Sequence, residues 1–144
     1  MPMLHFWAAV AILGLWHGAQ AQSQSCKDMI YENRNQTDYG PLQLTVIRGT
    51  VIDPQAVVIP QLCVGIFSEP DHKLISVSET NDKGEFEIKN VPKGDYRLVA
   101  HYVGFCPANV RVRIRPDLRG GKPLFIHMKP SGIDTCSYVD HKKK

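Results

Sequence analysis

Turn-forming residues recur at short intervals between Arg48 and Phe105, and they constrain the fold more than any other feature of the chain. Residues 81–84 (NDKG) and 91–94 (VPKG) each separate two extended runs. Asn and Asp can hydrogen-bond to their own backbone, Pro fixes φ, and Gly accepts a positive φ, so both clusters predict tight turns. This part of the chain is therefore expected to consist of short strands joined by turns.

The runs between these turns alternate apolar and polar residues, which is the period of a strand with one buried face. Phe86 and Ile88, for example, alternate with charged residues. No window of helical length outside residues 6–16 shows a 3.6-residue apolar period. The pattern predicts one all-β sandwich of seven or so strands, at residues 42–52, 62–67, 75–79, 86–88, 96–102, 110–114 and 123–128.

The first 21 residues have the features of a secretory signal peptide, although no Lys or Arg precedes the apolar run. The run from Phe6 to Trp16 is shorter than the roughly 20 residues that span a bilayer. Ala19 and Ala21 are small residues at the positions that a signal peptidase reads. We expect cleavage after Ala21 and a secreted or periplasmic protein with no membrane span. For a eukaryotic secretory pathway, residues 35–37 (NQT) fit a glycosylation acceptor at Asn35.

All four cysteines, Cys26, Cys63, Cys106 and Cys136, lie after that cleavage site. An even number of cysteines in an exported chain predicts two disulfides. Their wide spacing is unlike the closely spaced ligand pairs of zinc sites, so we expect no bound metal. Four cysteines allow three connectivities, and their spacing does not choose among these.

Four motifs, in this order, resemble the carboxypeptidase regulatory-like domain, a transthyretin-like or prealbumin-like sandwich. They are G-x-V-x-D (Gly49, Val51, Asp53), D-x-G-x-F (Asp82, Gly84, Phe86), P-x-G-x-Y-x-L (Pro92, Gly94, Tyr96, Leu98) and the pair Gly104-Phe105. The resemblance implies a seven-stranded Greek-key sandwich over residues 42–130. The rest of the chain is then expected to comprise a signal peptide (1–21), an N-terminal arm (22–41) and a C-terminal tail (131–144). Ala56 and Gln61 stand where the family often has Gly, which leaves the shape of the first connection open.

The family topology also implies a disulfide pairing. It sets the second and fifth strands side by side and antiparallel, which places Cys63 opposite Cys106 and implies a disulfide between them on the outer surface. Cys26 and Cys136 flank the domain, so a second disulfide between them would fasten both arms to each other.

No set of residues in the chain forms a recognisable catalytic site. None of the histidines after residue 21 belongs to a His-x-x-Glu metal pair, and no G-x-S-x-G nucleophile motif is present. Transthyretin-like hydrolases end in Tyr-Arg-Gly-Ser, and this sequence does not. We therefore expect a protein that is not an enzyme and binds no cofactor, and a small transthyretin-like hydrolase remains a third alternative.

Basic residues gather after residue 96. Seven of them stand against one aspartate between residues 97 and 129. Arg111, Arg113 and Arg115 share one strand face, and Arg97 is expected on the neighbouring strand. Together these four arginines define a basic stripe that could bind an anionic glycan or an acidic protein. The alternative is a solvated outer face whose charge is balanced by other acidic residues, Glu85 and Glu87.

Two kinds of ligand are disfavoured. A pI of 8.7 is moderate, and no aromatic stacking platform accompanies the arginines, so we expect no nucleic acid partner. Both tryptophans belong to the predicted signal peptide, which removes the residue that sugar sites often use for stacking. The sequence thus predicts a secreted, non-catalytic module with a structural or protein-interaction role and an unknown protein partner. The alternative is an anionic-glycan or other carbohydrate-binding module that uses the basic stripe.

Overall fold

The computed structural model describes residues 25–32, 40–132 and 136–142, so the predicted signal peptide and Asn35 lie outside the described residues. Within this part of the chain no helix is long and apolar enough to cross a bilayer. One helical turn, α1 (Cys26–Met29), precedes eleven strands. The strands are β1 (Leu42–Leu44), β2 (Ile47–Ile52), β3 (Cys63–Ser68), β4 (Leu74–Glu79), β5 (Glu85–Ile88), β6 (Gly94–His101), β7 (Phe105–Cys106), β8 (Ala108–Ile114), β9 (Leu124–His127), β10 (Lys129–Pro130) and β11 (Tyr138–Asp140).

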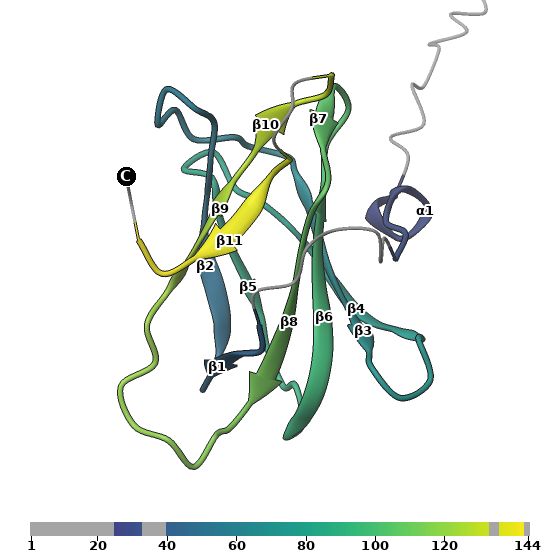
Figure 1. Ribbon diagram of the computed structural model, residues 1–144, viewed down its shortest axis with the longest axis vertical. Coiled ribbons are helices and arrows are strands. Elements are labelled where there is room, and N and C mark those ends of the chain that lie inside the picture. The colour runs from purple at the N-terminus through teal and green to yellow at the C-terminus, as the bar shows by residue number, and fades with distance from the viewer. Residues whose placement is uncertain (1–24, 33–39, 133–135, 143–144) are drawn as a thin grey trace, which may run out of the picture.

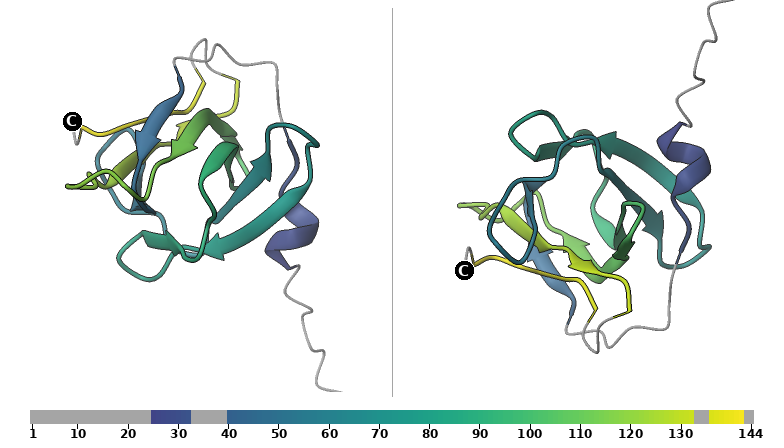
Figure 2. Two further views of the ribbon diagram at one scale, coloured as in Figure 1. Left: turned by 90° about the horizontal axis from the view of Figure 1, so that it is seen from below. Right: turned by 90° about the horizontal axis from the view of Figure 1, so that it is seen from above.

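Two sheets pack face to face, as Figures 1 and 2 show. The five-stranded sheet has the order β1-β8-β6-β3-β4, and the four-stranded sheet has the order β11-β9-β2-β5. A short pair, β10-β7, forms at one end of the sandwich. Neighbouring strands are antiparallel except for β1 with β8 and β2 with β9, which are parallel. This arrangement confirms the predicted all-β, prealbumin-like sandwich.

The predicted count of seven strands is wrong, because four short strands join the seven expected ones. The run predicted as one strand at residues 42–52 is interrupted at Thr45 and Val46, where the chain crosses from one sheet to the other. Its first part, β1, pairs with β8, and its second part, β2, pairs with β5 and β9. The other additions, β7, β10 and β11, have only two or three residues each. Alternation cannot be recognised over such short lengths.

The core lies between the sheets and uses the alternating positions that the sequence predicts. Val64 and Ile66 of β3 and Leu98 of β6 are completely buried against side chains of the four-stranded sheet. Burial of each such side chain contributes roughly 1.5–3 kcal/mol. Tyr96 is also buried, and its hydroxyl donates a hydrogen bond of 2.8 Å to the carbonyl oxygen of Pro92.

The turn cluster at residues 81–84 adopts the conformation that its residues favour. Asn81 Oδ1 accepts the backbone N–H groups of Lys83 and Glu85, each at 3.0 Å. Gly84 has φ 71°, and a Cβ atom there would lie 2.8 Å from the Cβ of Val58. Glycine is therefore required at this turn for both backbone angle and space.

The first connection keeps a left-handed backbone without glycine. Ala56 has φ 62° and Gln61 has φ 58°, both in the region that glycine occupies without strain. Ala56 and Gln61 therefore replace the glycines of the family pattern, but their backbone keeps the left-handed conformation that suits glycine.

Candidate functional site: the arms and the arginine face

The described part of the N-terminal arm begins with α1, which lies on the outer face of the five-stranded sheet, beside β3 and β4 (Figure 2). Cys26 of α1 forms a disulfide with Cys63 of β3. Ile30 is 7% exposed and lies over Gly65, where a Cβ atom would come within 3.2 Å of its side chain. These contacts form an outer cluster of apolar side chains from the arm and the sheet, namely Ile30, Cys63, Phe67 and Val99, with Cys26, Met29, Leu74 and Val77 packed against them.

The predicted disulfide pairing is wrong. The structure joins Cys26 to Cys63 and Cys106 to Cys136. Cys63 lies directly across from His101, the last residue of β6. Cys106 follows five residues later, beyond a turn and on β7, which pairs with β10. β6 ends at His101, so Cys106 does not lie opposite Cys63, and each arm has a disulfide of its own.

Arg97 was expected on the strand beside the other three arginines, and it lies on β6, directly across from Arg111 on β8. It is only 7% exposed, because its guanidinium group is enclosed by side chains of the same chain. Its Nε donates to Glu69 Oε1 at 2.9 Å and lies 3.9 Å from Glu32 Oε1 in the arm. Its Nη1 donates to Asn109 Oδ1 at 2.9 Å. Arg97 therefore belongs to a buried polar network that holds the arm against the sheet.

The other arginines of the basic stripe also contact groups of the chain. Arg111 Nη2 donates to the carbonyl oxygen of Gly40, at the end of the arm, at 3.1 Å. Arg113 Nε donates to Asp95 Oδ1 at 2.7 Å, and this hydrogen bond raises the pKa of Arg113. Arg115 Nη2 lies 3.2 Å from an oxygen of Asp117.

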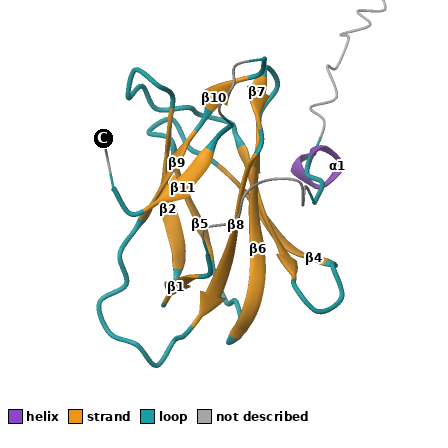
Figure 3. Ribbon diagram, in the orientation of Figure 1, coloured by secondary structure: helices purple, strands orange, loops and turns teal. Residues whose placement is uncertain are grey.

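The balancing acids differ from the expected ones. Hydrogen bonding to Arg115 lowers the pKa of Asp117, at the start of the long loop between β8 and β9 (Figure 3). Asp95 and Glu69 face Arg113 and Arg97, whereas the predicted partners Glu85 and Glu87 lie on β5, in the other sheet.

The C-terminal residues form an edge strand where a tail was predicted. β11 pairs antiparallel with β9, which places Tyr138 across from His127. Their rings stack at 4.4 Å, and His127 Nε2 lies 3.0 Å from both Asp140 Oδ1 and the carbonyl oxygen of Lys142. Both neighbours are hydrogen-bond acceptors, so an Nε2–H group donates to them and holds β11 against β9. The contacts of His127 are therefore structural.

A serine connects this strand to the end of the sandwich. Ser137 Oγ accepts the backbone N–H of Lys129 at 2.8 Å and donates to the carbonyl oxygen of Cys106. The neighbouring Cys136 is bonded to Cys106, so the disulfide and the hydrogen bonds act on the same segment. Sequence reasoning missed this strand, because its three residues are too few for a periodic signal.

His101 is the last residue of β6 and contacts the N-terminal arm. The ring of Tyr31 contacts it edge to face at 5.2 Å. Its Nδ1 is buried without a hydrogen-bond partner, and burial lowers the pKa of the ring. His101 and His127 belong to different sheets, and the described residues contain no group of three or more side chains that could hold a metal ion.

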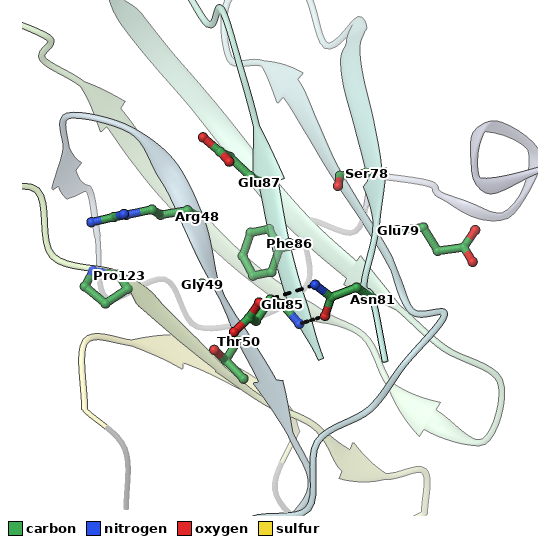
Figure 4. A pocket seen from close by; sticks show the side chains of 10 residues that line it. All are labelled: Arg48, Gly49, Thr50, Ser78, Glu79, Asn81, Glu85, Phe86, Glu87 and Pro123. Carbon is green, nitrogen blue, oxygen red and sulfur yellow. Dashed lines mark hydrogen bonds between the residues drawn. The ribbon is translucent and has the colours of Figure 1, made fainter. Parts of the chain in front are cut away.

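A shallow depression of about 560 Å³ lies where β4 and β5 form the open side of the sandwich. Figure 4 shows its lining, which includes Arg48 and three glutamates, Glu79, Glu85 and Glu87. Asn81 donates to Glu85 and fixes one side of the depression. No histidine or cysteine lines it. Its residues come from four separate stretches of the chain, so no local sequence pattern indicates it.

A family match and one structural neighbour agree with this architecture. The sequence pattern of the carboxypeptidase regulatory-like domain matches residues 46–121. The 5-hydroxyisourate hydrolase of Klebsiella pneumoniae is similar in structure, with a TM-score of 0.50 and 16% identity, over 71% of this chain and 96% of the hydrolase. The 3-chlorocatechol 1,2-dioxygenase of Rhodococcus opacus 1CP has a TM-score of 0.38 and 10% identity, over 78% of this chain and 70% of that enzyme. No curated protein sequence matches.

At 16% identity, the likeness to the hydrolase is evidence for the fold alone. The family match is stronger, since it spans more than half of the chain and includes all four motifs described above. The sheet order and the buried Tyr96 agree with it. The chain therefore belongs to the carboxypeptidase regulatory-like domain family.

Proposed function

We propose that the protein is a secreted or periplasmic, non-catalytic β-sandwich module with a structural or protein-interaction role. The observation that carries this proposal is the state of the basic stripe, whose four arginines all contact acceptors of the same chain. An anionic ligand would have to compete with these carboxylates and carbonyl oxygens. The stripe is better explained as part of the fold than as a ligand site.

Two disulfides support the location. Disulfides persist in oxidising compartments and are rare where thiols are kept reduced. A domain of this size also gains substantially from them, at about 2–4 kcal/mol each.

Binding of an anionic glycan is the second candidate, and one observation favours it. The side chain of Arg113 is 44% exposed and that of Arg115 is 34% exposed, so both can still be reached from solvent. Against this, the small depression of about 150 Å³ beside Arg113 is also lined by Glu69 and Asp95, which would repel an anion.

The test is binding to a sulfated polysaccharide at low and at physiological ionic strength. The wild type is compared with an Arg111→Ala/Arg113→Ala variant and with Lys83→Ala, which removes an exposed charge from a distant turn. The proposal predicts that the double variant binds no differently from the control. Binding that is strong at low salt, weak at high salt and lost only in the double variant would favour the glycan module.

A hydrolase is the third candidate, and it rests on the structural neighbour alone. An assay for hydrolysis of 5-hydroxyisourate should give no rate above the spontaneous reaction. Acceleration that disappears on His127→Ala, with the fold intact by circular dichroism, would overturn the non-catalytic assignment.

A further inference from the structure

The sheet edges of this molecule differ in how well they are protected. Among the described residues, the edge strands β1 and β11 have three residues each and β5 has four, whereas β4 has six. β5 is also protected by the exposed Glu85 and Glu87. Short strands and charged side chains are the usual means by which proteins prevent unwanted pairing at an edge. β4 is therefore the edge most able to accept another strand.

Among the described residues, no strand pairs with the outward edge of β4. Thr80, just after β4, donates to Leu62 and accepts from Gln61, each at 2.9 Å, so its backbone groups face the β3 side. In an antiparallel ladder this direction alternates, so Ser78 and Ser76 also face β3. The N–H and C=O groups of Val77 and Glu79 then point away from it, where the described residues place no further strand.

The side chains along this edge suit a second strand. A register shift opposite Ile66 and Phe67 makes the Leu74 end irregular and leaves residues 76–79 as the regular part. The serines here are small, and Ile75 is 47% exposed. The depression shown in Figure 4 borders Ser78 and Glu79, which leaves open space beside the strand.

The charges at the two ends of β4 are opposite. Lys73, just before the strand, has a side chain that is 77% exposed, and its contact with Asp71 is 3.9 Å long. Such an exposed ion pair contributes little to stability, so Lys73 can exchange it for another ion pair. Glu79, at the other end, is exposed. An antiparallel two-fold arrangement brings each Lys73 end beside the Glu79 end of a second copy.

We propose that β4 pairs antiparallel with β4 of a second copy of this chain, which joins the two five-stranded sheets into one continuous ten-stranded sheet. This inference rests on the proposed protein-interaction role and names its partner. The pairing satisfies the outward backbone groups of Val77 and Glu79 and covers the exposed Ile75. The opposite charges at its two ends select the antiparallel, two-fold arrangement over binding of an unrelated strand. One strand edge is a small interface, so the association is weak.

Sedimentation equilibrium from micromolar to millimolar protein tests this, with Lys73→Glu, Glu79→Lys and the double exchange Lys73→Glu/Glu79→Lys. Each single variant turns two attractive contacts into two repulsive ones, so we expect association to weaken about tenfold or more. The double exchange restores the opposite charges and should recover the wild-type association constant. Lys83→Glu, in the turn after β4, is the matched control and should have no comparable effect. Circular dichroism verifies that all variants are folded.

Amide hydrogen exchange gives a second measurement that needs no substitution. The amides of Val77 and Glu79 should become more protected as the protein concentration rises, while that of Lys83 should not. A chain that remains monomeric at millimolar concentration overturns the inference. So does a dimer whose association constant is the same in the wild type and in all the β4 variants. Neither result bears on the glycan and hydrolase assays, which test the proposed function separately.

Discussion

Replacing Arg97 with Met tests whether the basic stripe contributes to the stability of the fold. Methionine keeps much of the apolar stem and removes the guanidinium group, which contacts Glu69 at 2.9 Å and Asn109 at 2.9 Å. Breaking a buried ion pair by removing one partner costs about 3–5 kcal/mol. The Glu69 side chain keeps 20% exposure and can recover part of its hydration. We therefore expect Arg97→Met to lower the free energy of unfolding by about 2–3 kcal/mol.

The matched control is Arg113→Met on the next strand. Arg113 and Asp95 form an exposed pair, with side chains 44% and 50% exposed, and such pairs contribute about 0–1 kcal/mol. Urea denaturation with the disulfides intact gives both values. A second variant, Arg97→Met/Glu69→Leu, should recover part of the loss, because it removes the carboxylate left without its cation. The reasoning is refuted if Arg97→Met costs no more than Arg113→Met.

Three further perturbations have defined outcomes. Ala56→Gly and Gln61→Gly should each raise the free energy of unfolding by about 0.5–1 kcal/mol, since relief of left-handed strain exceeds the entropy cost of glycine; a loss of stability in both would contradict this. Tyr96→Phe should cost about 0.5–1.5 kcal/mol in thermal unfolding through loss of the hydrogen bond to Pro92, and no change would show that the bond is dispensable. The pKa of His101 is lowered by burial, so its stabilising contribution is complete above pH 6.5 and is lost as the pH falls below that value. His101→Gln should remove this part of the acid sensitivity, and an unchanged pH profile would exclude it.

The central part of the fold could be predicted from the sequence because its signals are local. Asn81 and Gly84 determine a turn within four residues, and Phe86 and Ile88 alternate over one strand. Tyr96 required both a buried ring site and a hydrogen-bond acceptor, and the carbonyl oxygen of Pro92 four residues away provides the acceptor.

The arms could not be predicted, since their contacts connect residues far apart in the sequence. Ile30 packs over Gly65, and Cys26 bonds to a cysteine 37 residues away. The basic stripe shows the same limit of prediction from local sequence. Its strand positions follow from alternation, but its acceptors come from the arm, from loops and from the strands β6 and β8. A count of local charges therefore suggested free cations where the structure has hydrogen-bonded ones.

The central claim is that the N-terminal arm is fastened to the outer face of the five-stranded sheet, separately from the C-terminal arm. Each of the four cysteines falls in a different tryptic peptide. Mass spectrometry of a tryptic digest made without reduction therefore identifies the pairing directly. We predict one linked pair of peptides for Cys26 with Cys63 and another for Cys106 with Cys136. Peptides that link Cys26 to Cys136, or Cys63 to Cys106, would contradict the account.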